Sequence, residues 1–248
     1  MTVRELREKY LAFFESKGHK RFPSGSLVPY DVTGKLDESL LFNGAGMIQF
    51  KPYFRGIAQP EHPRLATVQK CVRTNDIDEV GDATHLSFFE MLGNFSFGDY
   101  FKNQAIDFSW EFLTSKEWLG LDPTRLAFTI FENDDEAYDA WSLHLRGAGI
   151  DPDTRIFRLG EETNYWPAGA FSKGPPGPCG PNSEMFYWVE GTPPPCGLGG
   201  NMTAADCVTM GHGEGALGRM SNRTSPNSGR RVRGGLWRRR RRASSWSP

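Results

Sequence analysis

The stretch from Thr67 to Lys102 combines an arginine and two adjacent aromatic residues in a pattern suited to the recognition of a phosphate and a base. Arg73 ends a run of β-branched and polar residues, where its guanidinium group could contact a phosphate through two parallel hydrogen bonds. Phe88 and Phe89 are neighbours in a later extended segment, so their side chains point to opposite faces of a strand. One ring can join the core while the other offers a flat surface to a purine. The alternative is an ordinary hairpin with a surface arginine and packed aromatic rings.

A β-hairpin is the element that would position these residues. Residues 67–74 and 85–97 favour extended structure, and the polar segment 74–83 between them favours a loop. We expect a strand, a loop and an antiparallel strand, followed by a helix over 99–118 that Asp99 caps.

The rest of the first 189 residues alternates between helical and extended patterns. Thr2 and Glu5 have the spacing of a capping box, which predicts an N-terminal helix that ends near Gly18. The other expected elements are a strand at 40–42, a short helix at 47–54, a strand at 126–131, a helix capped by Asp134 that runs to Arg146, and strands at 155–159 and 185–189. Strands joined by hairpins or helices, without regular βαβ alternation, predict an α+β fold with an antiparallel sheet.

Charge and composition change abruptly at Glu190. The formal net charge is −1, but residues 190–248 contain ten arginines and three acidic residues, so residues 1–189 carry −8. The last 59 residues contain eleven glycines and no Ile, Phe, Tyr, Lys or Gln. Because this segment has too little apolar content to offset its ordering entropy, we expect 190–248 to be a disordered Gly/Arg-rich tail. Its run Arg238–Arg242 could contact nucleic-acid phosphates without sequence specificity, or could be incidental charge.

The cysteine pattern indicates a protein of a reducing compartment. Its four cysteines (71, 179, 196 and 207) form no C-x-x-C pair, which favours reduced thiols over a zinc site or a disulfide framework, and we assign no metal ligand. The N-terminus enters a charged helix without an apolar signal-peptide region, and no long apolar run suggests a membrane span. We expect a cytoplasmic protein with no membrane partner.

Several motifs carry a family resemblance. KCVRTND at 70–76 and FFEMLGNFSFGDYFK at 88–102 resemble the second signature motif of alanyl-tRNA synthetases, a class II family. FNGAGMIQFKPYFRG at 42–56 and NYWPAGAFSKGPPGPCGPNSE at 164–184 extend the resemblance, which covers about residues 2–189. It implies that residues 1–189 are the N-terminal part of a class II catalytic domain, with a class II synthetase-like antiparallel sheet flanked by helices and incomplete at its C-terminal side.

The resemblance also implies an activity and a nucleotide site. The implied reaction is the ATP-dependent activation of alanine to alanyl-adenylate and its transfer to the acceptor end of tRNA(Ala), with ATP and Mg²⁺ as cofactors. By this resemblance Arg73 holds the α-phosphate, Phe89 stacks on adenine and Met91 lines the same pocket. Such a site works by positioning and by electrostatic stabilisation of the reacting phosphate.

The resemblance assigns three further residues to substrates. Trp166 would wall the alanine pocket and limit the room to a methyl side chain, and Met47 is assigned to the same substrate site. Glu184 would assist ATP or Mg²⁺ binding. Trp166 could instead simply pack, and Glu184 could be a solvent-exposed glutamate. Position 182 is Asn182 where many relatives have cysteine, so a thiol role there is excluded.

The sequence departs from the family pattern in two places. The hairpin loop, which contains Asn75 and Asp76 and precedes His85, is shorter than in many relatives and lacks their loop lysine; His85 could be an ordinary loop histidine. No match to the third class II motif follows Val189. We therefore expect a truncated product with an out-of-frame tail and weak or absent aminoacylation. The alternatives are a non-catalytic nucleotide- or RNA-binding paralogue and a non-functional fragment.

Overall fold

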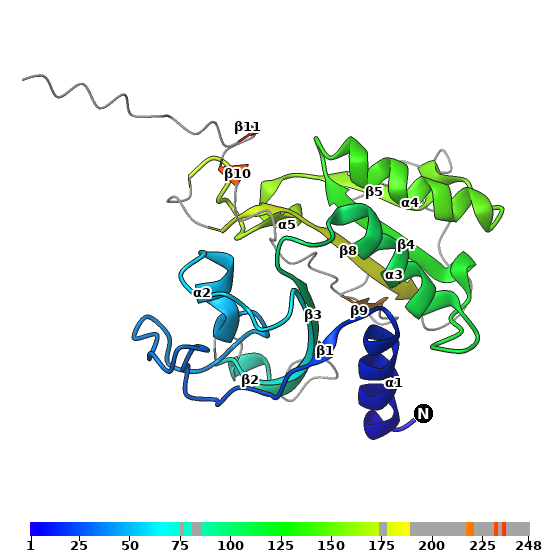
Figure 1. Ribbon diagram of the computed structural model, residues 1–248. Helices are drawn as coiled ribbons and strands as arrows, with labels where there is room; N and C mark the ends of the chain where they lie inside the picture. Colours follow the sequence, from blue (N-terminus) through cyan, green and yellow to red (C-terminus); the bar gives the residue numbers. More distant parts are fainter. Residues whose placement is uncertain are drawn as a thin grey trace, which may run out of the picture.

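A computed structural model describes residues 1–74, 77–80, 86–173 and 178–188, together with three short strands between 217 and 236. Its two main sheets lie side by side, each with helices on a face (Figure 1). The α+β fold class predicted from the sequence is confirmed.

The first sheet is built around the predicted hairpin. Strand β2 (Arg64–Val72) pairs antiparallel with β3 (Phe88–Ser96) along its whole length, and β1 (Lys20–Arg21) pairs parallel with β2. The two hairpin strands begin and end close to the ranges predicted from the sequence. The predicted loop residues Asn75, Asp76 and His85 lie outside the described part of the chain.

The second sheet has the strand order β5–β4–β8–β9. These strands are β4 (Leu126–Phe131), β5 (Ile156–Leu159), β8 (Ser183–Trp188) and β9 (Leu217–Met220). β8 is antiparallel to both of its neighbours, and β5 is parallel to β4. Each main sheet thus combines antiparallel pairing with one parallel edge strand, so both sheets are mixed. Two small ladders join β6 (Tyr165–Trp166) to β7 (Gly180–Pro181) and β10 (Arg231–Val232) to β11 (Gly235–Leu236).

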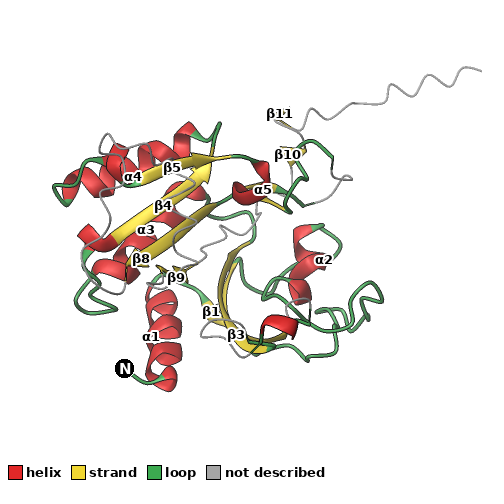
Figure 2. Ribbon diagram, turned by 180° about the vertical axis from the view of Figure 1, so that it is seen from behind, coloured by secondary structure: helices red, strands yellow, loops and turns green. Residues whose placement is uncertain are grey.

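The helices connect and cover these sheets. The α-helices are α1 (Val3–Ser16), α2 (Lys51–Phe54), α3 (Lys102–Thr114), α4 (Asp135–Gly147) and α5 (Glu161–Asn164). The 3₁₀ turns are η1 (Ile48–Phe50), η2 (Ile77–Glu79), η3 (Pro123–Arg125) and η4 (Pro152–Thr154). The capping box at Thr2 and Glu5 and the cap at Asp134 form as predicted. Helices α3 and α4 cover one face of the four-stranded sheet (Figure 2).

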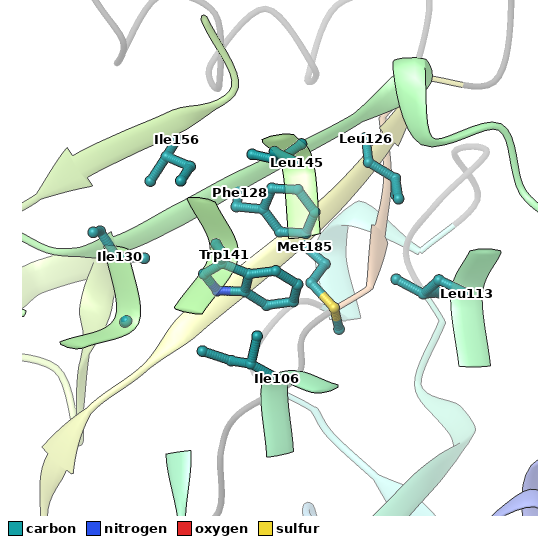
Figure 3. Packing of buried hydrophobic residues seen from close by; sticks show 10 residues of the cluster. Ile106, Leu113, Leu126, Phe128, Ile130, Trp141, Leu145, Ile156 and Met185 are labelled. Carbon is teal, nitrogen blue, oxygen red and sulfur yellow. The ribbon is translucent and has the colours of Figure 1, made fainter. Parts of the chain in front are cut away.

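The largest core cluster fills the space between α3, α4 and this sheet. Trp141 of α4 is fully buried and stacks on Phe128 of β4, with ring centroids 4.0 Å apart. Ile106 of α3 and Met185 of β8 complete its surroundings (Figure 3). A buried aromatic stack of this kind stabilises the fold beyond the area that it removes from water.

The hairpin is covered on both faces by different parts of the chain. On one face α1 packs its Phe13 and Phe14 against Ala66. On the other face Phe50 and Phe54 pack against Leu65 and Phe95. In both ribbon views α1 and α2 accordingly lie on opposite sides of the hairpin (Figures 1 and 2).

Two local predictions are wrong. Residues 40–42 form no strand: Leu41 and Phe42 lie in a bend, and Leu41 is 77 % exposed, because the Asp37 carboxylate accepts hydrogen bonds from Ser39 and closes a turn just before them. Asp99 does not cap α3; its carboxylate pairs with Arg64, and Phe101 occupies the N-cap position.

Candidate nucleotide site on the hairpin

The strand register decides which side chains share a face of the hairpin. Cys71 lies directly opposite Phe89, and Gln69 lies directly opposite Met91. Since side chains alternate along a strand and directly opposed residues share a face, these four residues point to the same side. This side faces the chain segment 43–54, away from α1.

Arg73 joins the same face just beyond the end of β2. Its guanidinium carbon lies 5.1 Å from the centroid of the Phe89 ring, within the range of a cation–π contact. Its Nε–H donates a 2.9 Å hydrogen bond to the carbonyl oxygen of Gly44, and its backbone N–H donates to the Ser87 carbonyl oxygen. The structure therefore brings a held cation and a half-buried aromatic ring together, as the nucleotide interpretation requires.

The segment 43–47 forms the opposite wall. The Val72 N–H donates to the Asn43 carbonyl oxygen, and the Gly46 N–H points to the Met91 sulfur at 3.2 Å. A Cβ atom on Gly44 would lie 3.4 Å from the Val72 carbonyl oxygen and 3.5 Å from Cγ of Arg73, so the Gly44 backbone passes close to the end of β2.

Cys71 is the one thiol of this face among the described residues, and its surroundings make it inert. Its side chain is fully buried, and burial raises the pKa of the thiol to about 11. The neutral thiol is a poor nucleophile and a poor metal ligand. Cys71 therefore contributes packing beside Phe89 and no covalent chemistry.

The remaining predicted residues lie on other elements. Trp166 is half-buried in β6, paired with Gly180, and Met47 packs against the apolar cluster around Phe50. Glu184 lies in β8 opposite Thr129 and is only 4 % exposed, which excludes the solvent-exposed alternative. The structure brings Arg73, Phe89 and Met91 together on the hairpin. It places Glu184 in the four-stranded sheet and Trp166 in the small β6–β7 ladder. The roles of all six site residues stay predictions.

Glu184 has a polar buried environment. Asn164, which is fully buried, donates from its Nδ2 to the Thr129 hydroxyl and to the Asn182 carbonyl oxygen, both at 3.0 Å. Asn182 is 4 % exposed.

In the part of the chain that the structure describes, no group of three or more His, Cys, Asp or Glu residues could hold a metal ion.

The sequence reasoning did not foresee the contact between Gly44 and Arg73 or the place of Gln69 in the site. Gly44 supplies the carbonyl oxygen that holds Arg73, and Gln69 lies fully buried beside Met91. The alternation of the strand could have placed Gln69 on the face of Met91, since the two strands were predicted. Nothing local to Gly44 indicates that its carbonyl group meets a residue 29 positions later.

The hairpin that presents Arg73 beside Phe89 lies inside the region of the chain that matches a known family. The chain belongs to the family described as tRNA synthetases class II (A), whose sequence profile matches residues 5–192. Among the described residues, no helix is long and apolar enough to cross a membrane.

Curated relatives narrow the comparison to one kind of synthetase. The chain is 53 % identical over 191 residues to an alanine–tRNA ligase of Rhodopirellula baltica, 55 % identical over 193 residues to one of Thermus thermophilus, and 51 % identical over 208 residues to one of Carboxydothermus hydrogenoformans. These matches cover 75–84 % of this chain and 19–22 % of the relatives. The chain thus spans about one fifth of the length of the curated relatives that it matches.

Proposed function

We propose that residues 1–189 are the N-terminal part of the catalytic domain of an alanine–tRNA ligase and that the hairpin face binds ATP. In this reaction the carboxylate of alanine attacks the α-phosphorus of ATP and pyrophosphate leaves; the alanyl group of the resulting alanyl-adenylate then passes to a hydroxyl group at the 3′ end of tRNA(Ala), and AMP leaves. The observation that carries the proposal is the Arg73 guanidinium, held by Gly44 and lying 5.1 Å from the Phe89 ring.

The chemistry of these side chains matches the needs of adenylate formation. Negative charge builds up on the α-phosphate oxygens during the attack, and a fixed cation stabilises it without having to reorganise. The Gly44 carbonyl oxygen engages Nε of Arg73 and so sets the direction of the guanidinium fork. Adenine would stack on the flat face of Phe89, and Met91 would line the pocket one step further along the same face.

The alanine and metal assignments extend the proposal. Trp166 and Met47 would border the alanine side chain, and Glu184 is the candidate carboxylate for ATP-bound Mg²⁺. Mg²⁺ in nucleotide sites is usually bound by one or two carboxylates together with substrate phosphates and water, so a dedicated cluster of protein ligands is not required. Cytoplasmic localisation and binding of the tRNA(Ala) acceptor end follow from the same proposal.

Titration of the 248-residue chain with Mg-ATP in a calorimeter tests the nucleotide site. Arg73→Ala removes charge-assisted hydrogen bonds to the phosphate and should weaken ATP binding about ten- to hundredfold, because such bonds contribute roughly 1.5–3 kcal/mol. Arg4→Ala is the matched control, since Arg4 is an exposed arginine of α1, on the other face of the hairpin. Equal ATP affinity in Arg73→Ala and the wild type would refute the site.

Alanine-dependent exchange of pyrophosphate into ATP tests the catalytic part. We expect weak or absent exchange by this chain, because no match to the third class II motif follows residue 189. Robust exchange would show that the remaining catalytic groups lie elsewhere in the 248 residues. Tight, salt-sensitive RNA binding that is lost on deletion of residues 230–248, without ATP binding, would instead favour an RNA-binding paralogue.

A further inference from the structure

Gln69 is a fully buried amide at the centre of the hairpin face, and its hydrogen bonds are complete. Its Oε1 accepts from the Gly25 N–H and from Nε2 of Gln49, both at 2.8 Å. Its Nε2 donates to the carbonyl oxygens of Gly25 at 3.2 Å and of Lys70 at 2.7 Å. A saturated amide in a dry environment fixes its partners strongly, because moving one of them leaves a buried polar group unpaired.

These bonds restrain the segment that contacts the nucleotide face. Gln49 belongs to η1, which directly follows the residues whose backbone meets the hairpin. Five positions before it, the Gly44 carbonyl oxygen accepts from Arg73, and three positions before it, the Gly46 N–H points to Met91. The Gln69 amide therefore anchors one end of a short segment whose other end sets the Arg73 guanidinium.

Two of the residues that hydrogen-bond the Gln69 amide also border a pocket. Gly25 and Gln49 both line an open pocket of about 520 Å³, with Phe22, Tyr30 and Tyr53 among its other walls. Gly25 and Gln49 both hydrogen-bond the Gln69 amide, and the Gln49 carbonyl oxygen also accepts from the N–H of Val32, another residue of the pocket wall.

We propose that Gln69 is a positioning residue for the nucleotide site. It holds segment 44–49 against the hairpin, so that the Gly44 carbonyl oxygen keeps the Arg73 guanidinium beside Phe89. Gln69 acts through Arg73 and touches no substrate. The expected effect on ATP affinity rests on the proposed function. The restraint of Arg73 by Gln69 does not depend on that function.

ATP titration of Gln69→Leu tests the consequence for binding. Leucine keeps the burial and most of the volume but removes all four hydrogen bonds. We expect the apparent Kd for ATP to rise about tenfold, because the fraction of molecules with Arg73 in place falls and the apparent Kd rises in inverse proportion. The matched control is Thr67→Val, a near-isosteric change at a fully buried position of the same strand and face, which should change the Kd less than twofold.

A double-mutant cycle separates positioning from general destabilisation. If Gln69 acts through Arg73, then Gln69→Leu should weaken ATP binding less than twofold in an Arg73→Ala background. The same tenfold loss in both backgrounds would overturn the inference.

The NMR signal of the Arg73 Nε–H supplies a measurement that needs no ATP. Its protection from solvent exchange should fall at least tenfold in Gln69→Leu and should be retained in Thr67→Val. If the wild-type chain does not bind ATP, the proposed function is disproved. Loss of the Nε–H protection in Gln69→Leu would still support the positioning role in that case. Unchanged protection in a folded Gln69→Leu chain would disprove the positioning role. If Gln69→Leu does not fold, Gln49→Met, which removes only the Gln49–Gln69 bond, should lower the protection about threefold, and no change would count against the inference.

Discussion

Phe88 and Phe89 have the same chemistry and adjacent positions, yet the fold gives them different surroundings. Phe88 lies opposite Val72 and is 53 % exposed, whereas Phe89 is half-buried beside Arg73 and opposite Cys71. The pleat of the strand separates the two rings onto opposite faces. Only Phe89 shares a face with the guanidinium group, so only Phe89 is suited to stack on a base next to a phosphate.

Replacing each ring in turn tests this distinction. Phe89→Ala should weaken ATP binding about tenfold, because stacking of a base on an aromatic side chain contributes roughly 1–3 kcal/mol. Phe88→Ala, the matched control at the neighbouring position, should change the affinity less than twofold. Both affinities can be measured by titration with ATP. A larger loss in Phe88→Ala than in Phe89→Ala would show that the nucleotide uses the other face.

His19 is a buried histidine that the proposed chemistry does not use. Its Nδ1 donates to the Phe14 carbonyl oxygen, and its Nε2 accepts from the Tyr100 hydroxyl group at 2.7 Å. Tyr100 in turn accepts a hydrogen bond from Asn94 of β3. Burial, with a smaller contribution from the charge of Arg64, lowers the pKa of His19 from 6.5 to about 4. The imidazole is therefore neutral in the folded chain at physiological pH.

This shift predicts how stability depends on pH. The unfolded chain takes up the proton as the pH falls below about 6.5, while the folded chain does not, so the stability from His19 is complete above that pH and is lost as the pH falls toward 4. Between pH 7.5 and 5.0 the free energy of unfolding should fall by about 2 kcal/mol from this group. Urea unfolding of the wild type and of His19→Gln at both pH values measures it; equal losses in the two proteins would contradict the prediction.

At the scale of elements, the start of α3 shows how a tertiary contact replaces a local one. The Asp99 carboxylate accepts from Nε and Nη2 of Arg64 at the start of β2, which lowers the pKa of Asp99. The Arg64 guanidinium also lies 5.2 Å from the Tyr100 ring. These contacts join the end of the hairpin to the chain that enters α3, and they leave Phe101, which has no side-chain acceptor, at the N-cap.

A better cap at this position should stabilise the protein. Phe101 is 57 % exposed, so Phe101→Ser removes little packing and supplies a hydroxyl group for the first backbone N–H groups of α3. Thermal or urea unfolding should show a gain of about 1 kcal/mol. Phe101→Ala, which removes the same ring without adding an acceptor, is the control and should show no such gain. Equal effects of the two substitutions would argue against a capping contribution.

At the scale of the whole molecule, α3 connects the two main sheets. Ile106 and Leu113 pack in the core of the four-stranded sheet, whereas Phe112 packs with the aromatic residues of α1 over the hairpin. The proposed ATP site lies on the hairpin face turned away from α1. The three residues that we assign to nucleotide contact on this face are Arg73, Phe89 and Met91, and all of them precede the tail that begins at residue 190.

Removing the arginine-rich end should therefore leave ATP binding intact. A chain that lacks residues 230–248 loses eight arginines but none of these contacts, so its Kd for Mg-ATP should agree with that of the 248-residue chain within twofold. The comparison should be made at two salt concentrations, because long-range attraction by the arginines would appear as a difference at low salt only. A large loss of affinity at both would place part of the nucleotide site in the tail.

Much of the local structure was predictable because its causes are local. The capping box of α1, the cap at Asp134 and the apolar run of β4 are all formed by residues close in sequence. The strand expected at 40–42 fails because it has no partner strand and because Asp37 closes a turn beside it. An apolar run of three residues does not by itself reveal whether a neighbouring strand exists.

The candidate site divides in the same way. The residue types that suit a nucleotide, and the family resemblance that assigns them roles, are present in the linear chain. The contacts of Arg73 with Gly44 and of Gln69 with Gly25 and Gln49 join positions 20 to 44 residues apart and follow from register and packing. Side-chain chemistry and short-range propensity belong to the sequence, whereas the pairing of distant groups depends on how strands align, because a shift of one residue would turn every side chain to the other face.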